Sequence, residues 1–211
     1  MSPTPTATEW VDPTLLPDDP ASRASLAAQE IAGNVPAYAK QLVCNVFFAY
    51  GVGDERDQFG YAVGRATRFV EMSVYPVKSE SQQGSGRTKT PRMEAVTVAE
   101  VAVTKQMLNG AGMLHGACLT YLIDNCASTP LVVLGILNGT NGVGVTQGMN
   151  VLFHAPAPVG SLLRITSSSI TMGSRIMSAR CEITDKSTSR VVASAFLNKM
   201  QPLPQAPKTK L

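Results

Sequence analysis

The sequence predicts an α+β fold in which an antiparallel β-sheet packs around one long apolar helix. An apolar helix of about five turns is expected after His115-Gly116, and segments with strand character stand on both sides of it. The connections between most of these strands are short, which suits antiparallel neighbours, because parallel strands need long crossovers. A helix this apolar needs a sheet to cover it.

An extension is expected to precede this core. Residues 1–20 are rich in Pro, Thr and Asp and lack sustained apolar periodicity, which predicts a loosely ordered arm. A helix is predicted from residue 22 to about 34, ending before Pro36, since the residue before a proline avoids the helical region. A second helical piece is predicted over 37–50, where apolar residues recur at helical spacing.

Six segments read as strands. Two precede the long helix, over 68–77 and 93–104, and a polar Gly/Ser/Gln/Lys loop at 79–90 separates them. The apolar phase changes within 93–104, which predicts a bulge or an edge adjustment there. Three to four strands are expected after the helix, in the segments Gly144–His154, Leu162–Thr171, Arg175–Asp185 and Arg190–Met200.

One carboxylate inside the apolar helix points to chemistry. Asp124 follows Leu122 and Ile123, where an isolated buried carboxylate would be costly to desolvate. The helix entrance at His115-Gly116 offers unpaired backbone N–H groups and partial positive charge, which can hold a developing oxyanion. The competing interpretation is that Asp124 is solvated or accepts a hydrogen bond at an interface.

The spacing of Gly116 and Asp124 constrains such a site. They are eight residues apart, and a helix rises 1.5 Å per residue, so their backbones lie about 12 Å apart on one axis. An aspartate side chain cannot bridge that distance. If both residues act on one carbonyl, the site is shared between two copies of the chain.

Several spaced motifs resemble one family. Asn109, Gly112, His115, Gly116 and Asp124 fall in the register of the hotdog-fold acyl-CoA thioesterases of the PaaI and thioesterase superfamily member 2 type. The segments Gly144–Asn150 and Pro156–Gly160 continue the resemblance, which covers roughly residues 92–200. The chain departs from the family pattern at Ala117 and Thr146, and Pro130 lies inside the helix.

The resemblance implies a hotdog fold and hydrolysis of an acyl-CoA thioester to a free acid and CoA. Asp124 would act as general base or as nucleophile, with Thr146 as its hydrogen-bond donor, and the Gly116 N–H of a partner subunit would hold the oxyanion. Asn109 would orient the water or the carbonyl, unless it is only a turn residue. His115 would be a general acid or would fix the loop. The residues expected to bind substrate or CoA are Ala117, Gly148, Met149, Asn150, Gly173, Ser174 and Arg175.

The resemblance also divides the chain. It implies a flexible arm at 1–20, a helical extension at 21–60, a hotdog domain at 61–202 and a tail at 203–211. A homodimer is expected, with a tetramer as a dimer of dimers left open. Four cysteines without C-x-x-C spacing and the lack of a visible secretory signal favour a cytoplasmic location, with mitochondrial and peroxisomal locations left open.

Composition and motifs argue against other classes. A net charge of +3 is too small and too dispersed to predict nucleic-acid binding, and the longest aliphatic run, Leu131–Leu137, is shorter than a membrane span. No metal-ligand cluster, G-x-S-x-G elbow or dinucleotide fingerprint is present, so neither a metal nor a cofactor is expected.

Two alternatives remain at this stage. One is a hotdog dehydratase or hydratase, a class that usually pairs its aspartate with a histidine a few residues later; here none lies between His115 and His154. The other is a catalytically silent acyl-CoA-binding protein, which Ala117 and Pro130 would suit.

Overall fold

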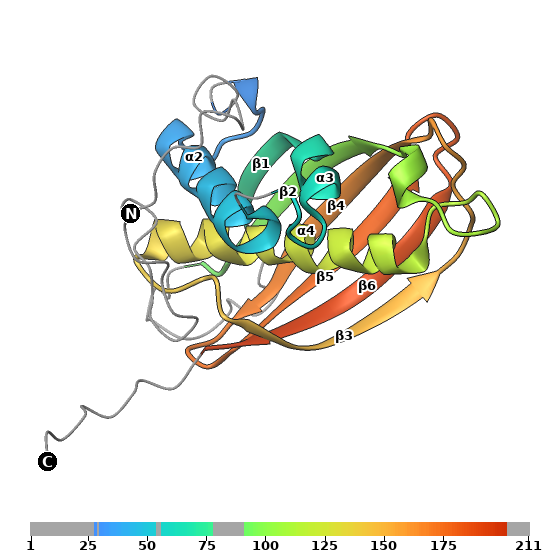
Figure 1. Cartoon of the computed structure of the whole chain (residues 1–211). Coiled ribbons are helices and arrows are strands. Elements are labelled where there is room, and N and C mark those ends of the chain that lie inside the picture. The colour runs from blue at the N-terminus through green and yellow to red at the C-terminus, as the bar shows by residue number, and fades with distance from the viewer. Residues whose placement is uncertain (1–27, 29, 54–55, 78–90, 202–211) are drawn as a thin grey trace, which may run out of the picture.

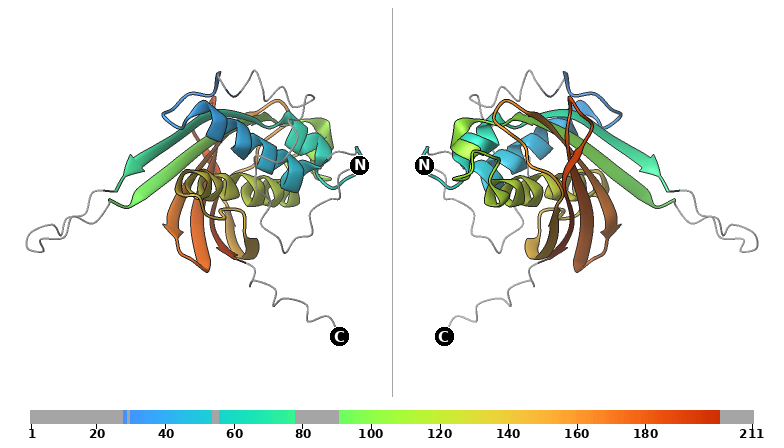
Figure 2. Two further views of the ribbon diagram at one scale, coloured as in Figure 1. Left: turned by 90° about the vertical axis from the view of Figure 1, so that its left-hand side faces the viewer. Right: turned by 90° about the vertical axis from the view of Figure 1, so that its right-hand side faces the viewer.

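A computed structural model describes residues 28, 30–53, 56–77 and 91–201. Its sheet curves around one central helix, α4 (Gly116–Asn138), and shorter helices cover the other side of that helix (Figures 1 and 2). The predicted antiparallel sheet around one long helix is therefore confirmed, with a helix of 23 residues that is longer than the five turns expected.

The sheet has six antiparallel strands in the order β1-β2-β4-β5-β6-β3. Their bounds are β1 Arg68–Pro76, β2 Met93–Ala102, β3 Val145–Phe153, β4 Leu162–Met172, β5 Ile176–Asp185 and β6 Val191–Met200. Each lies within three residues of its predicted bounds. β3 is an edge strand although it follows α4 directly in the chain.

The expected bulge lies in a different strand. The register between β1 and β2 shifts between Phe69 and Glu71, so the extra residue, Val70, belongs to β1. In β2 every residue from Thr97 to Val101 is buried. The change of apolar phase in β2 therefore reflects burial on both faces of the strand rather than an inserted residue.

The N-terminal extension differs from its prediction. The helix expected over 22–34 does not continue through residues 31–34; instead Ala32 forms a parallel bridge with Glu71 of β1. The buried Lys40 ammonium donates to the carbonyls of Ile31 and Gly33, at 2.6 and 2.9 Å, and holds this segment in place beside β1. The predicted arm at 1–20 and the loop at 79–90 lie outside the described residues.

The second predicted helix is present in two parts. α2 (Ala37–Val46) continues into a π-helix, η3 (Phe47–Val52), and after a gap α3 (Tyr61–Ala66) follows. A 3₁₀ turn, η4 (Lys105–Met107), lies after β2. Phe47 makes edge-to-face contacts with Phe48 in the same helix and with Phe69 of β1, at centroid distances of 5.4 and 5.0 Å. The aromatic side chains therefore pack η3 against β1.

A proline is accommodated inside α4 because a threonine replaces its missing donor. Pro130 has no N–H for the carbonyl of Cys126, four residues earlier. The Thr129 hydroxyl donates to that carbonyl at 2.7 Å. Since this uses its one proton, Thr129 accepts the 2.7 Å hydrogen bond from Thr97 of β2. α4 therefore remains continuous and is tied to the sheet at this point.

We expect Thr129→Val to destabilise the fold by about 1–3 kcal/mol, because the buried Cys126 carbonyl and the Thr97 hydroxyl both lose a partner without a change in side-chain shape. Urea unfolding followed by circular dichroism measures the difference. Thr129→Ser, which keeps the hydroxyl, is the matched control and should lose much less. Equal stability of Thr129→Val and the wild type would contradict this account of Pro130.

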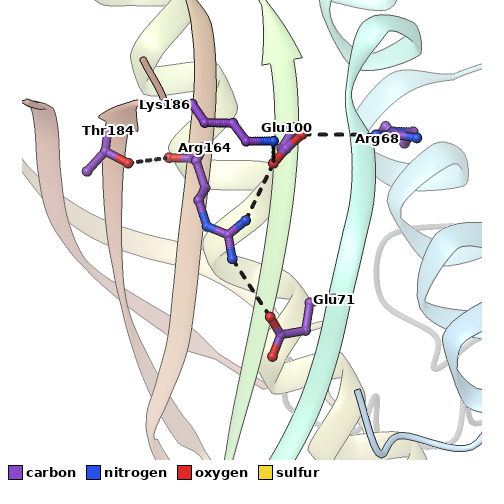
Figure 3. Close-up of polar contacts among 6 residues, drawn as sticks. All are labelled: Arg68, Glu71, Glu100, Arg164, Thr184 and Lys186. Carbon is purple, nitrogen blue, oxygen red and sulfur yellow. Dashed lines mark hydrogen bonds and ion pairs between the residues drawn. The ribbon is translucent and has the colours of Figure 1, made fainter. Parts of the chain in front are cut away.

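The face of the sheet away from α4 carries a row of charges (Figure 3). Thr97 faces α4, so Glu100, three residues later in the same strand, faces the other way. Its buried carboxylate contacts Lys186 at 2.7 Å and Arg164 at 3.4 Å, and Arg68 lies 4.0 Å away. These contacts cross β1, β2 and β4, so they favour the observed register on this face.

Candidate active site

Four polar side chains meet between α4 and the edge of the sheet. Asp124 and Ser128 lie one turn apart on α4 and share a face. Opposite them, Thr146 of β3 pairs in register with Lys199 of β6, so their side chains lie on the same face of the sheet. The Thr146 hydroxyl donates to Asp124 Oδ1 at 2.7 Å, and Lys199 Nζ donates to Ser128 Oγ at 2.9 Å.

The backbone explains how these side chains come together. The register of β3 against β6 shifts between Thr146 and Gly148, a local irregularity that can redirect a side chain near a site. On the helix, Ser128 donates to the Asp124 carbonyl at 2.7 Å. Its lone pairs are therefore left for Lys199. The expected pairing of Asp124 with Thr146 is thus observed within one chain.

A cavity of about 330 Å³ opens beside this cluster. Its polar side is formed by Asp124, Ser128, Thr146 and Lys199, and its apolar wall includes Val46, Phe47, Val132 and Val143. η3 closes the cavity and approaches α4 so closely that a Cβ on Gly51 would lie 2.2 Å from Asn125 Oδ1. The helical extension therefore contributes part of the cavity wall.

Lys199 was not among the candidates from the sequence. Its side chain is 7% exposed, and burial lowers the pKa of the ammonium to about 8, while the nearby charge of Asp124 opposes that shift. A signal was available, because Lys199 stands in phase with the buried Leu197 in β6. A lysine on the buried phase of a strand is rare without a partner.

A second, wider hollow of about 690 Å³ lies on the other side of Asp124 and is lined in part by Ala117, Tyr121 and Met149. Asp124 lines both hollows. Of the predicted substrate-binding residues, Ala117 and Met149 are therefore brought beside it.

The remaining predicted binding residues lie elsewhere. Asn150 lines a hollow with Arg180 and Glu94 on the outer face of the sheet, and Gly148 is exposed on β3. Gly173, Ser174 and Arg175 are exposed in the turn between β4 and β5. That turn adjoins the sheet end that carries Lys199, since Ile176 pairs with Met200.

His115 caps the start of α4, as predicted for a helix that opens on His-Gly. Its Nδ1 accepts the Ala117 N–H at 2.9 Å, so a neutral ring carries its proton on Nε2. Gly116 is the first residue of the helix, where the N–H has no intrahelical acceptor. The helix entrance therefore offers a backbone donor.

Asn109 holds the loop that leads to the helix. Its Oδ1 accepts from the N–H groups of Ala111 and Met113, at 2.9 and 3.2 Å. This is the turn role that an Asn-Gly pair favours. A further role in orienting a water stays a prediction.

The cysteines are free thiols. Cys44, Cys126 and Cys181 are buried, and burial raises the pKa of the partly buried Cys118 to about 11. These thiols are neutral at pH 7 and are weak nucleophiles in that form. Within the described residues, no group of three or more His, Cys, Asp or Glu side chains is arranged to hold a metal ion.

The thioesterase superfamily model matches residues 111–192, which span α4, β3, β4 and β5. This match covers less than half of the chain, and over these residues the chain is similar to the thioesterase superfamily. Mouse acyl-coenzyme A thioesterase 13 is 29% identical over 96 residues, which are 46% of this chain and 66% of the mouse protein. The aligned residues thus make up less than half of this chain and just under two thirds of the mouse protein.

Solved structures confirm the fold of the thioesterase domain. The crystal structure of zebrafish thioesterase superfamily member 2 aligns with 76% of this chain and 96% of its own, at 19% identity and a TM-score of 0.54. The mouse structure of the same name aligns over the same shares at 21% identity and a TM-score of 0.52. The fold is the hotdog fold, as the resemblance implied.

By length and composition alone, the central helix α4 could cross a membrane. In the structure it is the core helix of the fold, and 61% of its most apolar stretch is buried.

Proposed function

We propose that the protein is an acyl-CoA thioesterase that hydrolyses a thioester to a free acid and CoA. The observation that carries this proposal is the Asp124 carboxylate, held by Thr146 at 2.7 Å where two hollows meet in a thioesterase superfamily domain. The acyl group would enter the smaller cavity under η3, and the CoA side would leave through the wider hollow.

In the proposed reaction, Asp124 takes a proton from a water molecule that attacks the thioester carbonyl. The carbonyl oxygen becomes an oxyanion, which the Gly116 N–H at a helix entrance stabilises. Collapse of this intermediate breaks the carbon–sulfur bond, and the proton goes to the CoA thiolate. Attack by Asp124 itself, through an anhydride that water then hydrolyses, uses the same groups.

The proposed site needs two chains. On one helix, eight residues place the backbones of Gly116 and Asp124 about 12 Å apart. Gly116 lies at the Phe153 end of β3, since a Cβ on Gly116 would be 3.5 Å from the Phe153 ring. Asp124 lies near the other end of β3, where it accepts a hydrogen bond from Thr146.

Pairing β3 with β3 of a second copy would join these two groups. β3 is an edge strand with exposed apolar side chains: Val145 is 51% and Phe153 is 56% exposed. Such an edge is a template for another strand. Antiparallel two-fold pairing would set the Phe153 end of one chain beside the Thr146 end of the other, and so Gly116 near the second Asp124.

Hydrolysis is favoured over dehydration by the positions of the histidines. His115 caps α4, and His154 follows β3, where its Nε2 lies 2.8 Å from Ser194 Oγ. Within one chain neither lines the two hollows beside Asp124, and a His115 that arrived with Gly116 of a second copy would have its Nδ1 engaged by the Ala117 N–H. A dehydratase would need a histidine there as the partner of the aspartate.

Thiol release from a panel of acyl-CoAs tests the proposal. The purified protein should release free CoA from at least one acyl-CoA well above the rate in buffer, in a disulfide-exchange colour assay. Binding of acyl-CoA without thiol release would support the silent alternative, and formation of an enoyl thioester would support the dehydratase.

A further inference from the structure

We propose that Lys199 and Ser128 form a subsite for the far end of the acyl group, and that the preferred acyl groups are short chains ending in a carboxylate. This inference rests on the proposed function, because it assigns the substrate class of the same cavity. The family match ends at residue 192, so Lys199 and the η3 part of the cavity wall lie outside it, whereas Ser128 lies within it.

The first step concerns the buried ammonium. Lys199 is 7% exposed and lines the cavity, and among the described residues its Nζ has one hydrogen-bond acceptor, Ser128 Oγ. An ammonium has three donors. A buried charge with donors to spare is costly unless an acceptor meets it, and a ligand carboxylate in the cavity would supply that acceptor.

The second step concerns the neighbours of the ammonium. Ser128 directs its proton to the Asp124 carbonyl and its lone pairs to Lys199, so it orients the ammonium without competing as a donor. The cavity wall also includes Val46, Phe47, Val132 and Val143, whose apolar side chains suit a methylene chain. A purely aliphatic acyl end would offer the spare donors of the Lys199 ammonium no acceptor.

The third step concerns reach. Asp124, which would act at the thioester carbonyl, and Ser128, which marks the subsite, are four residues apart on α4, or about 6 Å. An extended chain advances about 1.25 Å per carbon–carbon bond because its bonds zigzag, so four bonds span about 5 Å and the carboxylate oxygen adds about 1 Å. A five-carbon dicarboxylic monothioester therefore fits the spacing.

The test compares glutaryl-CoA with pentanoyl-CoA, which has the same number of carbons but ends in a methyl group. For the wild type we expect the higher kcat/KM with glutaryl-CoA. In Lys199→Met, the ratio of the two kcat/KM values should fall tenfold or more, as expected for the loss of one hydrogen bond to a charged group. Lys186→Met, the same change on the outer face, should leave the ratio unaltered.

The pH dependence of the wild-type ratio gives a second readout that needs no variant. Burial lowers the pKa of Lys199 to about 8. Its side chain is therefore mostly charged at pH 7 and loses that charge as the pH rises to 9. The other titratable groups that line the cavity are Asp124 and Tyr50. Asp124 serves both substrates alike, and burial raises the pKa of Tyr50, which stays neutral. The preference for glutaryl-CoA should therefore decline across this range.

The possible outcomes separate the two proposals. Replacing a buried ammonium by an apolar side chain of similar length removes a desolvation cost, so Lys199→Met should fold, as a melting curve would show. An unchanged substrate ratio in this variant, or a wild-type ratio that is flat from pH 7 to 9, overturns the carboxylate subsite. Failure to release thiol from every acyl-CoA would instead overturn the proposed function.

Discussion

Asp124→Asn is expected to lower kcat for thiol release by about 10²-fold or more, in line with the usual contribution of a general base. Asparagine keeps the shape of the side chain and can still accept the 2.7 Å hydrogen bond from Thr146. It cannot take a proton from water. The loss should appear in kcat with every substrate that the wild type turns over, because the base acts on the water and not on the acyl chain.

Two controls separate this loss from damage to the site. Thr146→Val removes the donor but keeps the carboxylate, so it should lower kcat less than Asp124→Asn does. The melting temperature of Asp124→Asn should stay near that of the wild type, since Asp124 is half-buried and its neighbours are unchanged. Turnover of the purified variant within a few-fold of the wild type would exclude Asp124 as the base.

The parts that the sequence predicted well are those with local signals. The alternating strands, the His115-Gly116 helix entrance and the placement of Asp124 inside α4 each follow from side-chain pattern or capping chemistry. The contact between Asp124 and Thr146 came from the family resemblance, since 22 residues separate them in the chain.

The parts that were missed depend on contacts between distant segments. Residues 31–34 end the alanine-rich stretch that predicted a helix, but they lie beside β1, because Lys40 binds the carbonyls of Ile31 and Gly33 and backbone pairing to the strand replaces helical hydrogen bonds. Lys199 stands on the buried phase of β6, but its partner Ser128 is identified only by the packing of β6 against α4. Tertiary contacts of this kind override local propensity.

A mixture of two inactive variants is expected to recover activity if the site is shared between subunits. Asp124→Asn lacks the base, and Gly116→Val crowds the carbonyl at the helix entrance while leaving the base intact. The chain itself has room for the first added carbon, which would lie 3.5 Å from the Phe153 ring, so Gly116→Val should fold. Each variant then supplies the group that the other lacks.

The expected recovery is bounded by symmetry. After random subunit exchange about half of the dimers are mixed, and each mixed dimer has one site with both wild-type groups, so about a quarter of wild-type activity is the upper limit for independent sites. Differently tagged chains, purified in sequence, would isolate the mixed dimer, which should approach half of wild-type activity.

Disruption of the proposed β3 interface gives a further test of the shared site. A charge placed on the exposed part of β3, as in Leu152→Glu, should weaken pairing of the two edges and lower activity together with the dimer fraction in sedimentation, because the site would lose its partner donor. An active monomer, or verified mixed dimers without recovery, would show that Gly116 of a second chain is not the donor. Asp124 would then have to work with groups of its own chain. The helix entrance of that chain would not be one of them, because it lies about 12 Å away.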